Sequence, residues 1–313
     1  MDLLIALAGL VILVFAGDIL VRGAVALSLK VGIPALVVSL TVVAFGTSAP
    51  ELLIGIRAAL EDADGIVYGN VVGSNIANIL LVIGVPALIA TIRTQECETR
   101  RSFAMMIGAT LLFIALCFFG PLTYWHAAVM LAVLVFILFD TYRNASRHIE
   151  EVHADPLDEL EDADPDMAWW KVSTFILIGL IGLPLGANLL IEGAQAVALK
   201  LGVSEAVIGL TLVAVGTSMP ELATTVMATI RGKADVVLGN VIGSNLFNLL
   251  AIMGVSALFA PLAVPAGFLS WDLWVMLAAS LALVPFVLHW TNVTRLWGFV
   301  FVALYAGYIA HLV

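Results

Sequence analysis

The chain has 313 residues, of which 62% are hydrophobic and 12% are charged. Soluble domains carry about 25% charged residues, so this composition excludes a water-soluble enzyme, a disordered chain and a nucleic-acid-binding domain. The net charge of −10 comes largely from one stretch, because nine acidic residues lie between Glu150 and Asp166. The two cysteines, Cys97 and Cys117, form no CxxC pair, so no disulfide framework or zinc site is expected. The composition predicts a polytopic membrane protein.

Apolar runs between charged residues and Gly/Pro breaks predict ten membrane-spanning helices. They are expected near residues 2–27, 31–60, 66–90, 102–120, 124–143, 169–198, 202–231, 236–260, 271–289 and 293–312. The predicted fold is all-α, with five helices in each half. The expected organisation is a first five-helix repeat over 1–143, an acidic linker over 144–168 and a second five-helix repeat over 169–313.

The basic residues predict the orientation of these spans. If both termini are outside, eleven Lys and Arg residues lie on the inner side, and only Arg57 and Lys200 lie on the outer side. This distribution follows the positive-inside rule. We therefore expect a multi-pass protein of the plasma or inner membrane, with both termini extracellular or periplasmic and the 144–168 linker cytoplasmic.

Two pairs of segments repeat at a shift of 170 residues. The segments TVVAFGTSAPEL (41–52) and TLVAVGTSMPEL (211–222) are identical at nine of twelve positions. The segments GNVVGSNIAN (69–78) and GNVIGSNLFN (239–248) are identical at seven of ten positions. Because each half has an odd number of spans, the second copy enters the membrane from the opposite side. Inverted repeats with broken, polar helices at matching positions are typical of secondary transporters, whose binding site lies near the bilayer midplane.

The two GTSxPE segments each place a carboxylate beside a helix break. Glu51 and Glu221 fall mid-span, where an ionised carboxylate without a partner costs several kcal/mol. The Gly and Pro residues on either side weaken the helix and partly free carbonyl groups near Ala44, Thr47, Ala214 and Thr217. The residues expected to form or support the two breaks are Gly46, Ser48, Pro50, Gly216, Ser218 and Pro220.

Each repeat therefore offers several oxygen ligands on one face. Thr47 precedes Glu51 by four residues, and Thr217 precedes Glu221 by four, so each pair shares a helix face. Carboxylates, hydroxyls and carbonyls are hard ligands that suit Ca²⁺ or Na⁺. One Ca²⁺, or two to three Na⁺ in adjacent subsites, would neutralise two carboxylates. Because an empty, doubly ionised site crosses the membrane poorly, this favours obligatory exchange over a uniport or an open pore.

The GNVxGSNxxN segments contribute neutral polar groups. Ser74 and Asn78 are four residues apart and share a helix face, as do Ser244 and Asn248. Hydrogen bonds between helices are the alternative explanation for these Ser and Asn residues.

At these motifs the sequence resembles the sodium/calcium exchanger family of the cation/calcium antiporter superfamily, as a prokaryotic member. The resemblance spans essentially the whole chain. It implies a Na⁺-driven Ca²⁺ extruder that works by alternating access, with the first and sixth helices sliding over a fixed core. It also implies transported Ca²⁺ and Na⁺ within a lipid bilayer, no enzymatic activity, no cofactor and no obligatory protein partner.

The resemblance further implies three sets of site residues. The calcium ligands would be Glu51, Glu221 and the carbonyls of Thr47 and Thr217. The outer sodium site would comprise Ala214, Thr217, Ser244 and Glu51. The inner sodium site would comprise Ala44, Thr47, Ser74 and Glu221. Asn78 and Asn248 would complete the centre.

The driving ion is the main alternative that the sequence leaves open. Potassium-dependent relatives carry Asp where this chain has Asn248, which favours potassium-independent exchange. Proton-coupled relatives typically replace the GSN element with one that contains Glu, whereas this chain keeps GSN in both copies. A proton-coupled or potassium-dependent antiporter is therefore the second hypothesis. A passive cation channel or a membrane-embedded enzyme is a remote one, because GxSxG, HExxH and GxGD motifs are all absent.

Overall fold

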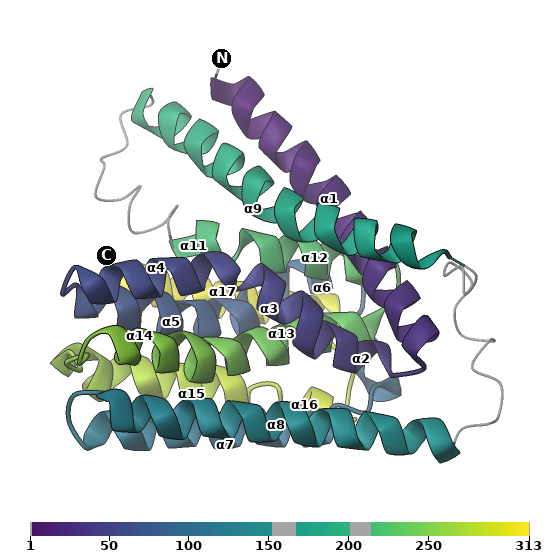
Figure 1. Cartoon of the computed structure of the whole chain (residues 1–313). Coiled ribbons are helices and arrows are strands. Elements are labelled where there is room, and N and C mark those ends of the chain that lie inside the picture. Colours follow the sequence, from purple (N-terminus) through teal and green to yellow (C-terminus); the bar gives the residue numbers. More distant parts are fainter. Residues whose placement is uncertain (1, 152–166, 201–213, 313) are drawn as a thin grey trace.

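The computed structural model describes residues 2–151, 167–200 and 214–312, without the side chains of 96, 145–151, 214 and 215 (Figure 1). All named secondary-structure elements in this part of the chain are helices, which confirms the predicted all-α class. The only β-type pairs among these residues are two isolated antiparallel bridges, Ile92–Val293 and Leu122–Leu262. Each bridge joins a loop of the first half to a loop of the second.

The first half follows the predicted spans closely. Its elements are α1 (Asp2–Val31), α2 (Ala35–Val38), the π-helix η1 (Ser39–Val43), α3 (Ala44–Thr47), α4 (Ala49–Leu60), α5 (Asp64–Leu80), α6 (Gly84–Ile89), the 3₁₀ turn η2 (Thr94–Glu96), α7 (Arg100–Phe118) and α8 (Tyr124–Glu151). Helix α8 continues eight residues past the expected end of the fifth span at residue 143. Part of the predicted linker is therefore helical, and its residues 152–166 lie outside the described part.

The second half has the same succession of long helices, but its described π-helices lie at other positions. It comprises α9 (Trp169–Lys200), α11 (Ala214–Thr217), α12 (Met219–Ile230), α13 (Ala234–Leu246), the π-helix η5 (Phe247–Ile252), α14 (Met253–Phe259), the π-helix η6 (Phe268–Asp272), α15 (Leu273–Leu281), α16 (Val284–Val287) and α17 (Arg295–Leu312).

Over the described residues, eight helical segments are long and apolar enough to cross a membrane. The bent pair Ala35–Thr47 and Ala49–Leu60, with an angle of 46°, raises this number to nine. The seventh predicted span, 202–231, begins within 201–213, outside the described part. The count of ten spans therefore stays a prediction.

Helices α1 and α9 form a long pair that lies diagonally across the other helices (Figure 1). Small residues bring their backbones together: a Cβ atom at Gly182 of α9 would lie only 2.8 Å from the Cβ of Ala16 in α1. An ion pair between Asp2 and Lys200 joins the two helices at one end. The pair thus packs as a unit against the rest of the bundle.

Helices α5 and α13, which carry the two GNVxGSNxxN motifs, form the centre of the bundle. In the α13–η5–α14 span, 89% of the most apolar stretch of 18 residues is buried inside the bundle. Close packing requires glycine there, because a Cβ at Gly243 would lie 2.6 Å from the Cβ of Ala44, and one at Gly239 would lie 2.8 Å from the Cβ of Ser39. The second span of the first repeat is thereby held against α13 of the second.

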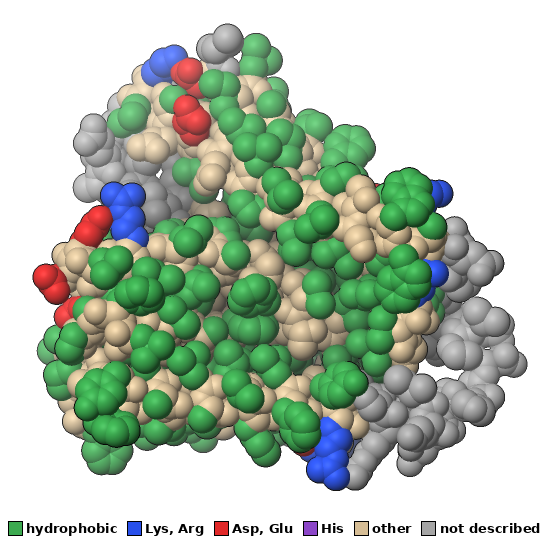
Figure 2. Space-filling model, in the orientation of Figure 1, with side chains coloured by type: hydrophobic (Ala, Val, Ile, Leu, Met, Phe, Trp, Pro, Cys, Tyr) green, Lys and Arg blue, Asp and Glu red, His purple; other side chains and the backbone are tan. Residues whose placement is uncertain are grey.

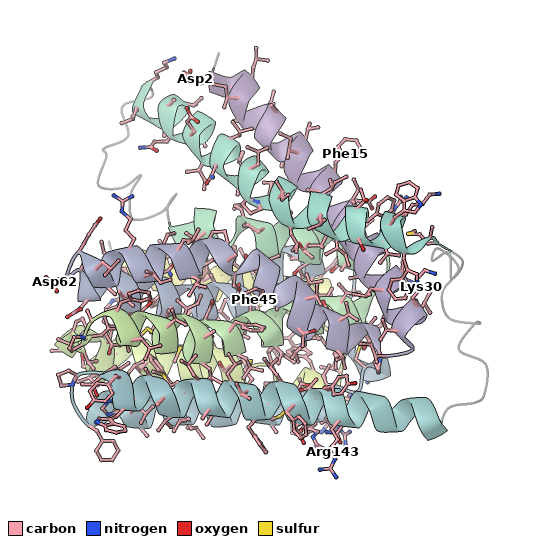
Figure 3. All side chains as sticks on the ribbon, viewed as in Figure 1. Asp2, Phe15, Lys30, Phe45, Asp62 and Arg143 are labelled. Carbon is pink, nitrogen blue, oxygen red and sulfur yellow. The ribbon has the colours of Figure 1, made fainter. Side chains whose placement is uncertain are left out.

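The surface agrees with a location in the membrane. Hydrophobic side chains cover the visible face of the bundle, and the charged side chains gather near its ends (Figure 2). Lys30 and Arg143 lie at one end of the helices, whereas Asp62 lies at the other (Figure 3).

Candidate ion-binding site

Two helix breaks with nearly the same geometry position the repeated glutamates. Ser48 has φ −87° and ψ 7°, and Ser218 has φ −86° and ψ 7°. After each break a helix of 12 residues begins, with Pro in its first turn and then Glu51 or Glu221. The start of a helix favours a negative charge, because unpaired N–H groups and the helix dipole point toward it.

The break residues of one repeat contact the glutamate of the other. Glu51 and Glu221 are each only 1% exposed. The Ser48 hydroxyl of the first repeat donates a hydrogen bond to Oε1 of Glu221 at 3.1 Å. The two breaks therefore form a single buried site.

Two asparagines that the sequence analysis did not single out hold the glutamate backbones. Asn70 donates from Nδ2 to the carbonyl of Glu51 at 3.0 Å, and Asn240 donates to the carbonyl of Glu221 at 3.5 Å. Asn240 also donates to Thr225 Oγ1 at 3.2 Å. The signal was present in the sequence, since both asparagines are identical members of the matched GNVxGSNxxN segments.

Asparagines of the two GNVxGSNxxN segments contact each other across the interface between the repeats. Asn78 donates from Nδ2 to Oδ1 of Asn245 at 3.1 Å. Asn245, in turn, lies 3.5 Å from the carbonyl of Asn75. Asn245 is therefore a further site residue missed from the sequence. These bonds fix the Asn78 amide so that its NH₂ group, and not its oxygen, is used by the protein.

Six buried side-chain oxygens of the repeated motif segments have no hydrogen-bond partner among the described residues. Among the described residues, ten buried side-chain polar atoms lack a partner, and six of them belong to the four motif segments. A buried polar atom without a partner costs free energy, so a cluster of them indicates a ligand. All six are oxygens of the kinds that bind Ca²⁺ and Na⁺. They are Glu51 Oε2, Asn78 Oδ1, Ser218 Oγ, Glu221 Oε2, Ser244 Oγ and Asn248 Oδ1.

The other expected ligands belong to the same motif segments. Thr47 and Ser74 are buried, and Thr217 is half-buried. The Ala44 carbonyl, expected to be partly free, accepts the Ser48 N–H at 3.0 Å and the Thr47 hydroxyl at 3.3 Å. Pro50 removes the N–H that would reach the preceding turn at residue 46, so the Ala44 carbonyl keeps its helical partner. Ala214 begins α11, and its side chain lies outside the described part.

The glycines of the two breaks make room for helix α9. Leu180 of α9 occupies the position that a Cβ atom would take at Gly46. Ile191 of α9 does the same at Gly216. These glycines therefore do more than loosen a turn. They let one of the two long helices pack directly over the buried site.

Known proteins share this sequence and architecture. Residues 1–142 and 171–313 match the family model described as sodium/calcium exchanger protein. The chain is 34% identical to the sodium/calcium exchanger MaX1 of Methanosarcina acetivorans, over 99% of this chain and 98% of MaX1. It is 36% identical to the putative antiporter CaxA of Alkalimonas amylolytica, over 93% of this chain and 91% of CaxA.

A solved structure agrees over the whole chain. The sodium-calcium exchanger NCX_Mj, soaked with zero Na⁺ and Ca²⁺, superimposes with a TM-score of 0.84 at 31% identity, covering 100% of this chain and 99% of NCX_Mj. The family match covers both halves, and the resemblance seen in the repeated motifs is thereby confirmed. The protein is a multispanning membrane protein that belongs to the sodium/calcium exchanger family.

Proposed function

We propose that the protein is an antiporter that exchanges Na⁺ for Ca²⁺ and uses the Na⁺ gradient to extrude Ca²⁺. The observation that carries this proposal is the set of six unpartnered, buried oxygens contributed by both repeats. Two of them belong to carboxylates, and the other four belong to hydroxyl or amide groups. A cation without its water shell would replace the missing hydrogen bonds.

The charge of the site supports exchange over passive flow. Glu51 and Glu221 together carry −2 when ionised, and both are buried. One Ca²⁺ neutralises this charge, as do Na⁺ ions bound at adjacent subsites. An uncompensated carboxylate deep in the membrane costs several kcal/mol, so the empty site changes sides slowly. The site therefore changes sides only when it holds bound cations.

The residue assignment keeps the two repeats equivalent. Ca²⁺ is held by Glu51, Glu221 and the carbonyls of Thr47 and Thr217. Two sodium sites flank it, one formed by Ala214, Thr217, Ser244 and Glu51 and the other by Ala44, Thr47, Ser74 and Glu221. The unpartnered oxygens of Asn78 and Asn248 line the centre between them.

Movement of the α1–α9 pair over the fixed helices would alternate access to the site. In the described part, α1 packs along α12, whereas α9 makes no comparable contact with α4, its counterpart under the repeat. This inequality is what one state of an alternating-access transporter requires. In our proposal both termini lie on the outer side of the membrane, and the basic helix ends near Lys30 and Arg143 lie on the cytoplasmic side.

The proposed exchange is independent of K⁺ because Asn248 contributes an oxygen without a negative charge. Flux measurements in proteoliposomes test this directly. Ca²⁺ uptake, followed with ⁴⁵Ca²⁺, should be driven by an outward Na⁺ gradient and should be the same with K⁺ or choline as the other cation. Uptake driven by a pH gradient alone would favour a proton-coupled antiporter. A K⁺ requirement would favour the potassium-dependent branch, and flux without any counter-ion gradient would indicate a channel.

A further inference from the structure

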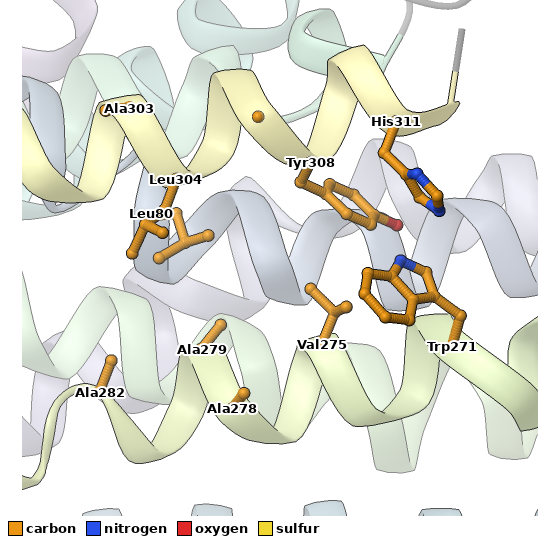
Figure 4. Close-up of a pocket in the computed structure, with 11 residues that line it drawn as sticks. Leu80, Trp271, Val275, Ala278, Ala279, Ala282, Ala303, Leu304, Tyr308 and His311 are labelled. Carbon is orange, nitrogen blue, oxygen red and sulfur yellow. The ribbon is translucent and has the colours of Figure 1, made fainter.

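An apolar groove lies between α15 and α17, on the outer surface of the second repeat. It has a volume of about 360 Å³ and also touches Leu80, the last residue of α5. Ala278 and Ala282 form one wall, and Ala303 and Gly307 form the other (Figure 4). A volume of this size is in the range of sites that bind small ligands. Nothing in the proposed transport cycle uses the groove.

The equivalent face of the first repeat carries larger side chains at two positions. Helix α8 corresponds to α17 at a shift of 171 residues, so Phe136 takes the place of Gly307 and Ala132 that of Ala303. At the shift of 170 that holds for α7 and α15, Leu112 takes the place of Ala282. In the first repeat, α7 packs directly on α8. Around Gly307, by contrast, no described atom lies within 4 Å of the position that a Cβ would take. The fold itself therefore does not require the groove.

The two ends of the groove differ in chemistry. At one end the rings of Trp271 and His311 lie 5.1 Å apart, and the Tyr308 hydroxyl donates to Asp272 Oδ1 at 3.0 Å. Trp and Tyr side chains of this kind gather at the level of lipid headgroups. The opposite end is closed by Ala282, Ala303 and Leu80, all apolar (Figure 4).

The length of the groove matches one leaflet of a bilayer. From Trp271 to Ala282 the helix advances by roughly 17 Å, about half of the ~30 Å hydrocarbon core. Leu80 lies two residues after Asn78 of the central site, so the closed end reaches the depth of the ion-binding residues. The groove thus runs from the headgroup level to the middle of the membrane.

We propose that one acyl chain of a membrane phospholipid occupies this groove, with its phosphate beside Trp271 and His311. The walls carry no charge along their length and open onto the hydrophobic surface that the bilayer covers. The indole N–H of Trp271 and the imidazole of His311 are hydrogen-bond donors suited to a phosphodiester. The negatively charged Asp272 already accepts a hydrogen bond from Tyr308, which reduces its repulsion of the phosphate.

Native mass spectrometry of the full-length protein, purified in detergent and delipidated, tests the assignment. The wild type should retain one phospholipid per chain. The double substitution Ala303→Val with Gly307→Ile fills the groove from α17 and should reduce the retained fraction at least tenfold. Ala306→Ile, on the same helix but outside the groove, is the matched control and should retain the lipid.

A second variant protects the test against misfolding. Ala282→Leu narrows the groove from α15 alone and should cause the same loss of phospholipid. Unchanged lipid retention in these filled variants would overturn the proposal. So would a bound fatty acid in place of a phospholipid, or a change from dimer to monomer on filling the groove, which would make it an interface between copies of the chain.

Discussion

Asp18 of α1 and Arg231, at the end of α12, form an ion pair with a distance of 2.5 Å between Oδ1 and Nη2. Both side chains are mostly buried, with 18% and 16% of their surfaces exposed. Asp18 also pairs with Arg22 within α1 at 3.1 Å. The repeat offers no second copy of the interhelical pair, because the equivalent positions hold Asn188 and Glu61.

Breaking this pair should loosen α1 from α12 on the side predicted to be cytoplasmic. Gly17 packs against Met227, so Cys residues at these two positions should form a crosslink in an otherwise wild-type chain. Adding Asp18→Asn should reduce the crosslinking rate severalfold, because a mostly buried ion pair holds more strongly than an exposed one. Arg22→Gln is the control, since its pair lies within α1. An equal effect of both substitutions would contradict a role in holding the helices together.

Glu51→Gln and Glu221→Gln should each abolish Na⁺-dependent Ca²⁺ flux. An amide keeps the shape of the side chain but leaves a bound Ca²⁺ with one uncompensated positive charge in the membrane, at a cost of several kcal/mol. Because 1.4 kcal/mol is a factor of ten, the loss should exceed about 100-fold. Glu61→Gln, at an exposed carboxylate paired with Arg57, is the control and should retain full flux. Normal exchange by either site variant would disprove the assigned site.

Asn248→Asp should make transport sensitive to K⁺ or to pH. The substitution raises the formal charge beside the two glutamates to −3, and the added carboxylate must take up a proton or a further monovalent cation. Wild-type exchange should be equal in K⁺ and in choline, whereas the variant should differ between them. Asn78→Asp provides the equivalent change in the first repeat. A wild type that requires K⁺ would show that the role of Asn248 has been misassigned.

Asn240→Ala should weaken Ca²⁺ binding without removing it. Asn240 supports the Glu221 carbonyl and Thr225, and the Thr47 hydroxyl lies 3.5 Å from its Oδ1. The loss of one hydrogen bond costs about 1 kcal/mol, or roughly fivefold in affinity. A binding titration should show at least this change, and a smaller one for Asn70→Ala, whose side chain has a single hydrogen-bond partner among the described residues, the Glu51 carbonyl. The reverse order would argue against Asn240 as the main positioning residue.

Gly243→Ala should destabilise the folded protein. The new methyl group would lie 2.6 Å from the Cβ of Ala44, at the contact between α13 and the broken span. Such overpacking typically costs about 1–3 kcal/mol. The melting temperature in detergent should therefore fall, whereas Gly108→Ala on α7, with no described atom within 4 Å of its Cβ position, should leave it unchanged or slightly higher.

The sequence by itself determined the class of protein, the approximate spans, the repeat and the identity of the two glutamates. It could do so because each of these follows from local chemistry. A long run of apolar residues indicates a membrane span. Pro, Gly and Glu within such a span cost free energy unless they line a binding site. The same pattern occurring twice, at a shift of 170 residues, then identified the repeat without knowledge of any contact.

Only the tertiary structure decided which groups meet. The two repeats have nearly the same local sequence, so the sequence could not tell that Ser48 bonds the glutamate of the other copy, or that Asn240 has more partners than Asn70. The approach of η1 to α13 across Gly239 and Gly243 produces these contacts. The Asp18–Arg231 pair joins residues 213 positions apart, and the groove at Gly307 depends on how two helices pack. Local patterns do not encode such distances, because they arise only when the whole bundle is assembled.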